Sequence, residues 1–485
     1  MDLLADDRAA LSALALVNSD CRQHRDLYNS IWGELADTVT LEERDILRKT
    51  ATDEYFEIQC ASILDAMKYA MPHLETLSWY DTMCLGDNFF RTVTKLPIRH
   101  LKISRGYISD PYCLDLLAPF VMSLETLYLD VSICEDEDHE NDTTNDSDAY
   151  EDVDFGRLRY LDLTDCFDNP DTMAWCSLLS APLRHFALPG STSGSFMQSI
   201  SACQPLRDLE TLVLPSLCSK SAAEARSLFD FMSRHSHVRK LSVQHGDPQL
   251  MDSYLVPLLS DGTWSNLTSL SLAWRGPGLA VETEPNIAVI SAESLAAIGS
   301  IKSLEQLCLR AGEPLGWRHQ WLVDHEVVRS SLRGLTNLKR LAFSRDTYTK
   351  PGFPESMVES YYSYQFVASD EGHIAMERPY LDRPRSTMRM YDGPTNDDLW
   401  FYYSEVNGVQ LWECAHRNRM LREAESYSRA LPSLEWIYCG QWPMGFKNVQ
   451  TAKGRRRISV PLGKERDSCY TLLERMFAMR GGDDD

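Results

Sequence analysis

Two short motifs in this sequence contain residue types that could perform chemistry. His325 and Glu326 begin a stretch resembling zinc-protease helices, in which a second His must stand four residues after the first. Arg329 occupies that position, so the second metal ligand is missing. The run from Gly190 to Gly194 has the spacing of a nucleophile elbow, but with Thr192 at the nucleophile position we favour a Gly/Ser turn. We therefore predict no enzyme, no cofactor and no metal.

The cysteines are expected to be free thiols. The chain has 485 residues, of which 44% are hydrophobic and 25% are charged. Its thirteen cysteines include no Cys-x-x-Cys pair, and several, such as Cys60, Cys308 and Cys439, have apolar neighbours. This pattern favours buried thiols over disulfides or a zinc site.

Charge and hydropathy limit the partners and the location. The net charge of −23 argues against nucleic acid, whose phosphates need clustered Lys and Arg, and favours a basic or neutral protein surface. No apolar run approaches the roughly 18 residues that span a bilayer, and Ala13 to Val17 lacks the basic flank of a signal peptide. We expect a cytoplasmic protein that does not contact membranes. The basic run 454–457 could act as a nuclear signal or be a solvated loop.

A six-residue phrase recurs along the chain. Its first, fourth and sixth residues are apolar, and its clearest copy is Leu158 to Leu163. Because alternate residues of a strand point to opposite faces, each copy predicts a short strand with one buried face. The copies begin at Leu74, Ile98, Leu124, Leu158, Leu183, Leu209, Val238, Leu267, Leu304, Leu338 and Leu434.

The spacing of these copies is typical of leucine-rich repeats. Most consecutive copies lie 24 to 29 residues apart, and helical patterns lie between them at 111–122, 221–234, 249–259 and 292–301. One strand and one helix cannot bury their own apolar faces, so neighbouring units must stack. The predicted fold is α/β: a curved leucine-rich-repeat solenoid with parallel inner strands, outer helices and an N-terminal helical cap.

The polar side of the strands is the predicted binding surface. Early copies present aromatic and acidic residues there and late copies Lys and Arg, and aromatic residues and Arg commonly anchor protein interfaces. The alternative is that these residues only solvate the sheet. The predicted partner contacts are Lys102, Tyr128, Asp130, Tyr160, Asp162, Lys240, Arg310 and Arg340.

The expected organisation follows from the repeats and their interruptions. The acidic run 135–154 has few apolar residues and predicts a disordered insert, while 345–430 has too many aromatic residues for a linker. The predicted segments are 1–50 (N-terminal helical segment), 51–73 (helical cap), 74–344 (repeats), 345–430 (aromatic-rich insert and helix) and 431–485 (last repeat-like unit and C-terminal helix).

The N-terminal segment 1–50 has helices predicted at 8–22 and 27–35. These helices carry Leu14, Leu16, Val17, Asn18, Cys21, Arg22, Leu27, Tyr28, Ile31 and Trp32. Through these residues, segment 1–50 resembles a partial F-box, namely the latter half of that motif. The C-terminal stretch leading into 431–444 is similar to F-box/leucine-rich-repeat proteins of the type predicted in filamentous fungi.

The resemblance implies a non-catalytic substrate receptor of a cullin-type (SCF) ubiquitin ligase. Such a receptor would hold its target protein on the concave repeat surface, while its N-terminal helices bind the ligase adaptor. The Leu-Pro segment and first helix of an F-box have no counterpart after Met1. Two alternatives therefore stay open: the helices only cap the array, and the chain is a scaffold without a ligase role. The implied adaptor contacts are Leu14, Leu16, Val17, Leu27, Tyr28, Ile31 and Trp32.

Overall fold

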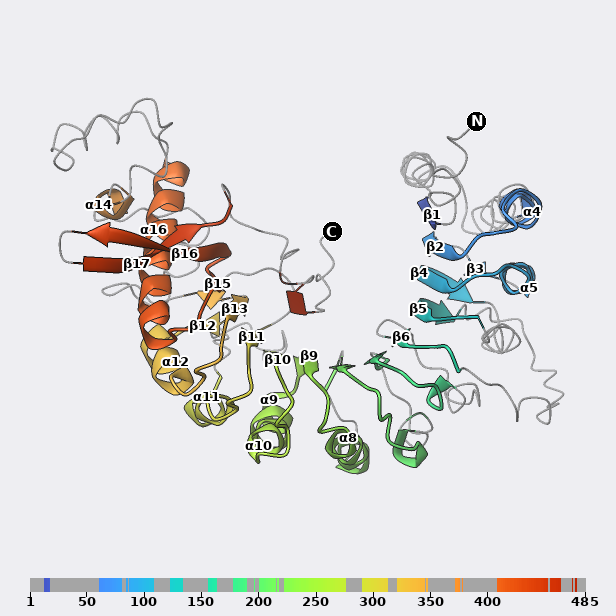
Figure 1. The fold of residues 1–485 in the computed structure, drawn as a ribbon, viewed down its shortest axis with the longest axis horizontal. Coiled ribbons are helices and arrows are strands. Elements are labelled where there is room, and N and C mark those ends of the chain that lie inside the picture. The colour runs from blue at the N-terminus through green and yellow to red at the C-terminus, as the bar shows by residue number, and fades with distance from the viewer. Residues whose placement is uncertain are drawn as a thin grey trace, which may run out of the picture. The chain divides into compact units, whose positions relative to one another are not determined.

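The fold is known from a computed structural model of the chain (Figure 1). The structure describes residues 13–17, 61–80, 84–85, 87–108, 123–133, 156–163, 178–189, 196, 200–214, 216–217, 222–275, 290–312, 321–344, 346–347, 371–375, 377, 408–451, 454–463, 473, 476 and 477.

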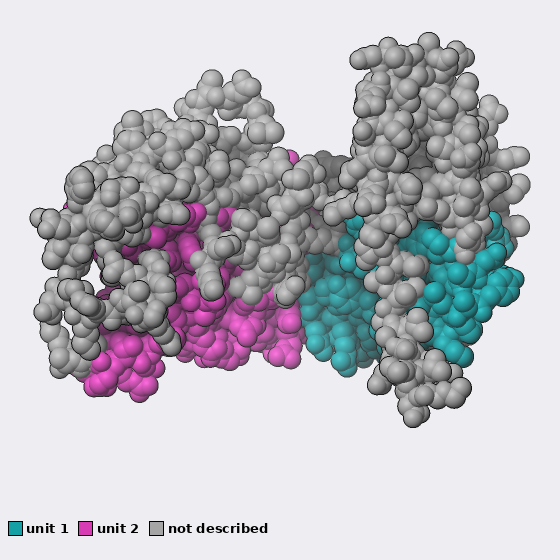
Figure 2. All heavy atoms as spheres, turned by 90° about the horizontal axis from the view of Figure 1, so that it is seen from above, with its two compact units in different colours: residues 1–215, 220–235 teal, residues 216–219, 236–485 magenta. Residues whose placement is uncertain are grey.

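The chain divides into two compact units (Figure 2). Unit 1 comprises residues 1–215 and 220–235, and unit 2 comprises residues 216–219 and 236–485. Each unit contains consecutive copies of the phrase and is described by itself. The curvature expected for the whole array stays a prediction.

Unit 1 is a parallel sheet whose strand order follows the chain order. The strands are β1 (Ala13–Val17), β2 (Thr76–Tyr80), β4 (His100–Ile108), β5 (Thr126–Ile133), β6 (Tyr160–Asp162), β7 (His185–Ala187) and β8 (Thr211–Leu214), and β3 (Cys84–Leu85) pairs with β4. The helices of this unit are α4 (Ala61–Ala70), α5 (Asp87–Val93) and α8 (Ala222–Arg234).

Unit 2 continues the same pattern and ends in an antiparallel hairpin. Its parallel strands are β9 (Lys240–Gly246), β10 (Ser269–Trp274), β11 (Gln306–Ala311), β13 (Arg340–Ser344) and β15 (Trp436–Cys439), followed by antiparallel β16 (Trp442–Thr451) and β17 (Gly454–Pro461). A separate pair is formed by β12 (Trp321–Leu322) and β14 (Asp346–Thr347). The helical elements are α9 (Pro248–Leu250), η4 (Met251–Leu255), α10 (Val256–Ser260), α11 (Ala292–Ile298), α12 (His325–Leu332), α14 (Glu371–Ala375) and α16 (Gly408–Ala430).

The strand prediction is confirmed in every copy of the phrase. Each strand from β2 to β15 that belongs to a copy begins at the third residue of that copy. The apolar positions are buried throughout; Leu158, Leu161 and Leu163, for example, are each 0% exposed. Burying one such side chain stabilises the fold by about 1.5–3 kcal/mol, so the repeated leucines supply the core that no single unit could form.

Backbone hydrogen bonds fix the register between copies. The carbonyl oxygen of Glu75 accepts hydrogen bonds from the amides of Arg99 and His100 at 2.7 and 3.0 Å. The carbonyl oxygen of Glu305 does the same for Lys339 and Arg340, at 2.8 and 3.0 Å. The second residue of one copy is therefore tied to the second and third residues of the next, which keeps equivalent side chains in line across the sheet.

Two predicted local structures are wrong. Residues 13–17, inside the predicted helix 8–22, form strand β1, which pairs in parallel with β2 from Ala13–Thr76 to Val17–Tyr80. An unpaired sheet edge offers backbone groups to any extended neighbour, which can outweigh helix propensity. The basic run 454–457, predicted as a loop, lies in strand β17. There Arg456 contacts the Glu425 carboxylate at 2.9 Å.

Most of the predicted helices that fall in the described ranges are confirmed. Helix α8 matches 221–234, α16 is the helix expected at the end of 345–430, and α4 lies within the predicted helical cap 51–73. The helix predicted at 249–259 is continuous through α9, η4 and α10, with a π-helical middle, and α11 ends three residues before the predicted 301. The predicted helix 111–122, the acidic insert 135–154 and most of 345–407 lie outside the described residues.

Helices α11 and α12 pack closely at a glycine. An added methyl group at Gly299 would overlap the carbonyl oxygen of Ser331 in α12. The φ of Gly299 is −62°, so alanine fits the backbone and the cost comes from the forced separation of the helices. We expect Gly299→Ala to destabilise unit 2 by about 1–3 kcal/mol, the usual cost of overpacking, in urea denaturation. The neighbouring exposed Ser300→Ala is the control, and equal midpoints for the two variants would contradict the close packing.

Candidate functional site

The side chains opposite the buried leucines form aligned rows across unit 1. We call the surface made by the third and fifth residues of each copy the ladder face. Lys102 of β4 is in register with Tyr128 of β5, which is in register with Asp162 of β6. Two residues before Asp162, Tyr160 is in register with His185 of β7. Four consecutive strands therefore place aromatic and ionisable side chains next to one another.

These neighbours contact one another directly. The ammonium nitrogen of Lys102 lies 4.7 Å from the centre of the Tyr128 ring, a cation–π contact. The rings of Tyr160 and His185 are stacked, with centres 4.0 Å apart and planes within 5°. The Tyr160 hydroxyl lies 3.4 Å from Asp162 Oδ2, a hydrogen bond at the long limit. The contacts limit the rotamers of the side chains and so lower the entropy lost when a partner binds.

The exposure of these residues separates surface groups from supporting ones. Lys102 is exposed, and Tyr128, Asp130 and Tyr160 are partly exposed. Asp162 is only 7% exposed, so our expectation that it lies on the surface is wrong. Its buried carboxylate accepts the hydrogen bond from the Tyr160 hydroxyl and so supports Tyr160 instead of meeting a partner first.

In unit 2 the predicted contact residues do not form one cluster. Lys240 and Arg340 are exposed and stand in one row, separated by Ser269 and Gln306. Arg310 is 4% exposed, which contradicts its expected place on the surface. The next row of the ladder face is uncharged, and its members on β11, β13 and β15 are Cys308, Ala342 and Tyr438.

The C-terminal residues cover this uncharged row. Leu473 and Phe477 are buried in one apolar cluster with Cys308, Ala342 and Tyr438, together with Trp436 and the partly buried Met476. The three covering residues have helical geometry. The amphipathic C-terminal helix was predicted, but its position was not, because a contact between positions more than 100 residues apart leaves no local pattern.

The predicted adaptor contacts are only partly within the structure. Leu14, Leu16 and Val17 lie in β1. The other four predicted contacts lie outside the described residues; they are Leu27, Tyr28, Ile31 and Trp32. The parallel register of β1 with β2 supports the interpretation that this segment closes the edge of the array.

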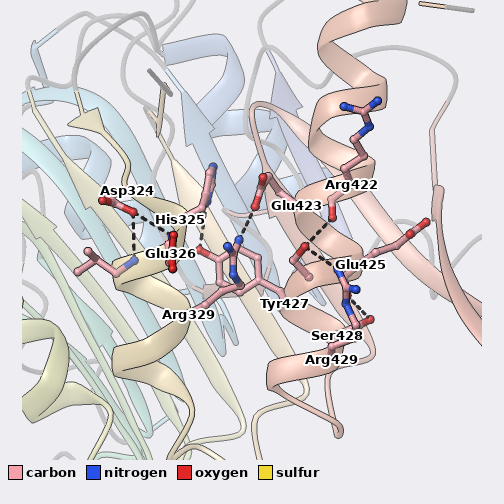
Figure 3. Close-up of polar contacts among 12 residues, drawn as sticks. Asp324, His325, Glu326, Arg329, Arg422, Glu423, Glu425, Tyr427, Ser428 and Arg429 are labelled. Atoms are coloured by element: carbon pink, nitrogen blue, oxygen red, sulfur yellow. Dashed lines mark hydrogen bonds and ion pairs between the residues drawn. The ribbon is translucent and has the colours of Figure 1, made fainter. Parts of the chain in front are cut away.

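The zinc-protease-like motif joins two helices (Figure 3). Asp324 caps α12, accepting hydrogen bonds from the amides of Glu326 and Val327. His325 Nδ1 lies 3.1 Å from the Tyr427 hydroxyl of α16, and burial lowers the pKa of His325 to about 4, which keeps the ring neutral. Arg329 forms an ion pair with Glu423. These side chains hold α12 against α16, and Arg329 stands where a second metal ligand would be needed.

The remaining chemical motifs contribute nothing further. The run from Gly190 to Gly194 lies outside the described residues. Within the described ranges, no three His, Cys, Asp or Glu side chains gather as metal ligands would. Cys308 and Cys439 are buried, as predicted, whereas Cys203 and Cys414 are only partly buried. No helix in these ranges has the length and hydrophobicity to cross a membrane.

Two solved structures resemble parts of this chain. A leucine-rich-repeat protein of Leptospira interrogans aligns over 56% of this chain and 71% of its own, with 12% identity and a TM-score of 0.23. Internalin C2 of Listeria monocytogenes aligns over 57% of this chain and 75% of its own, with 11% identity and a TM-score of 0.20. No family model matches the sequence, and no curated protein matches it.

The repeats themselves decide the fold. One parallel strand per copy, with the three apolar positions buried in every copy, is the arrangement that the leucine-rich-repeat pattern requires. The chain has leucine-rich-repeat architecture. Function has to be argued from its surfaces, because folds of this kind carry many functions.

Proposed function

We propose that this chain is a non-catalytic protein-binding protein whose ladder face in unit 1 holds the partner. The observation that carries the proposal is the row of half-exposed aromatic and basic side chains on β4 to β7: Lys102, Tyr128, Tyr160 and His185. Tyrosines and cations that are already in contact provide large amphipathic surface at low entropic cost. The exposed part of Tyr128 and Tyr160 makes them the expected binding hot spots.

The charge of the chain indicates the kind of partner. With a net charge of −23, long-range attraction favours a protein with a basic or neutral surface. Lys102 and His185 on an acidic chain would add local contacts to acidic or carbonyl groups at the centre of such a surface. Binding should therefore be faster at low ionic strength and lose little of its affinity at high salt.

The test compares tyrosines on the ladder face with an exposed tyrosine elsewhere in the chain. In a variant carrying both Tyr128→Ala and Tyr160→Ala, we expect binding of a co-purified partner to weaken by at least about 30-fold, because the loss of even one hot spot costs about 2 kcal/mol. The control is Tyr254→Ala, because Tyr254 is 56% exposed but lies on η4, away from the ladder face. Binding is measured by calorimetry with the purified partner, and equal losses in both variants would contradict the proposal.

A finer hypothesis is that the chain is a substrate receptor of a cullin-type ubiquitin ligase. Its support is the F-box resemblance of residues 14–32, while the strand at Ala13–Val17 favours the scaffold alternative. Direct binding of the purified ligase adaptor would support the receptor. The informative variants are Leu27→Asp and Trp32→Asp, which should abolish adaptor binding and leave the partner of unit 1 bound. Absence of adaptor binding to the natural chain would leave the scaffold function.

A further inference from the structure

The fifth position of the copies loses contact with water along the array. Lys102 on β4 and Tyr128 on β5 keep contact with water, whereas Asp162 on β6 is 7% exposed and the fifth residues of β7 and β8, Ala187 and Val213, are 1% and 2% exposed. In unit 2 the corresponding residues of β11 and β13 are Cys308 and Ala342, both 0% exposed. Small apolar side chains leave a shallow sheet surface, and such a surface is stable in water only when something apolar covers it.

In this chain, one side of a short helical segment near the C-terminus covers this surface. Leu473, Met476 and Phe477 are spaced i, i+3 and i+4, so they lie on one side of a helix. Phe477 is 4% and Leu473 0% exposed, and both pack on the cluster that contains Trp436 and Tyr438. In Figure 1 these dark red residues lie on the side of β11 and β13 away from α11 and α12.

We propose that the ladder face of β11, β13 and β15 is a docking surface for an apolar helical segment, and that residues 473–477 are its intramolecular occupant. The contacts that hold the segment are between apolar side chains, which give no directional lock. Occupancy then depends on the covalent link, which gives the segment a millimolar effective concentration. A partner helix with the same Leu/Met/Phe spacing binds by displacing it.

This arrangement makes the C-terminal segment a regulator of the docking surface on β11, β13 and β15. A partner in solution competes with a tethered segment and must bind more tightly than the segment to open the surface. Any change that adds charge to the apolar side of residues 473–477 frees the row of Cys308, Ala342 and Tyr438. The inference is independent of the function proposed for unit 1, because it uses none of the same residues.

The test uses a labelled peptide of residues 467–480, with Cys469 replaced by Ser, and the full-length chain. In the double variant Leu473→Asp with Phe477→Asp, the tethered segment is released, and we expect the peptide to bind in fluorescence anisotropy. The natural chain should bind the peptide at least tenfold more weakly, because its own segment occupies the surface. A peptide carrying the same two Asp substitutions should bind neither protein.

Two further measurements keep the test decisive. Adding Ala342→Glu to the double variant should abolish peptide binding, because Ala342 lies at the centre of the covered row. If the double variant fails to fold, Phe477→Ala alone replaces it, with a smaller gain of binding expected. Absence of binding to the folded released chain, equal binding to the natural and released chains, or binding unaffected by Ala342→Glu would each overturn the proposal.

Discussion

Replacing Gly440 by alanine should cost unit 2 about 2–5 kcal/mol, from the left-handed conformation and from overpacking together. Gly440 and Gln441 form the two-residue turn between β15 and β16, with φ values of 54° and 62°. Positive φ at both positions is the signature of the type I′ turn, for which glycine is strongly preferred. An added Cβ would also lie 2.6 Å from Met420 Sδ and 2.9 Å from His416 Cε1.

The destabilisation caused by Gly440→Ala should be concentrated in the hairpin of β15 and β16. The turn is held from two sides. The Gly440 amide donates a hydrogen bond to Asp346 Oδ2 at 2.7 Å, and the Gly440 carbonyl accepts one from His416 Nε2 at 2.8 Å. Hydrogen exchange of the β15 and β16 amides should therefore accelerate most. Gly445→Ala in the same hairpin is the control, because its added Cβ would meet only the exposed Leu462 side chain. Similar exchange in both variants would contradict the role of the turn.

Replacing Asp346 by asparagine should make unit 2 increasingly more stable, relative to the natural chain, as the pH rises. Burial raises the pKa of the Asp346 carboxyl from 3.8 to about 7, against the hydrogen bond from the Gly440 amide, which lowers this pKa. The folded protein therefore keeps a proton that the unfolded chain releases between about pH 4 and 7. Over this range the free energy of unfolding contributed by Asp346 falls as the pH rises, and above about pH 7 it stays at its low value.

Asparagine keeps the acceptor for Gly440 without the buried charge. Because one pKa unit corresponds to about 1.4 kcal/mol, the stability of Asp346→Asn relative to the natural chain should increase by on the order of 2–3 kcal/mol between pH 5 and 8. Burial lowers the pKa values of His325 and His416 to about 4, so their contributions rise with pH between about 4 and 6.5. These contributions are the same in both proteins and cancel in the difference. Urea denaturation at pH 5, 6.5 and 8 measures the difference in free energy of unfolding between the two proteins. A difference that does not change with pH would mean that Asp346 titrates at its ordinary pKa.

The local pattern was enough to predict the strands. A phrase such as Leu304 to Leu309 places its apolar residues on one face of an extended segment, and repetition at a regular spacing allows only stacking to bury them. The segment from Ala13 to Val17 was mispredicted for the complementary reason. Its residues are compatible with a helix by themselves, and the free edge of β2 provides the partner that makes them a strand.

For the candidate binding residues, the local pattern predicted the direction of the side chains but not their exposure. Strand alternation predicted that Lys102, Tyr128 and Tyr160 share one face, because their spacing within each copy fixes the direction of each side chain. Exposure was not predictable, since Asp162, the fifth residue of its copy, and Arg310, the residue just after its copy, both alternate with the buried leucines and are nevertheless buried. Burial depends on what covers a position, and the covering residues can lie anywhere in the chain.

By itself, then, the sequence determined the repeating strand, its buried leucines and the alignment of the ladder face, because these depend on neighbours a few residues apart and on a period of 24 to 29 residues. The tertiary structure alone decided the closing hairpin, in which Asp346 and His416 meet at Gly440, and the cover of Leu473 and Phe477 on β11 and β13. These contacts join residues separated by 24 to more than 150 positions. No periodic pattern specifies such pairs, and only the packed chain brings them together.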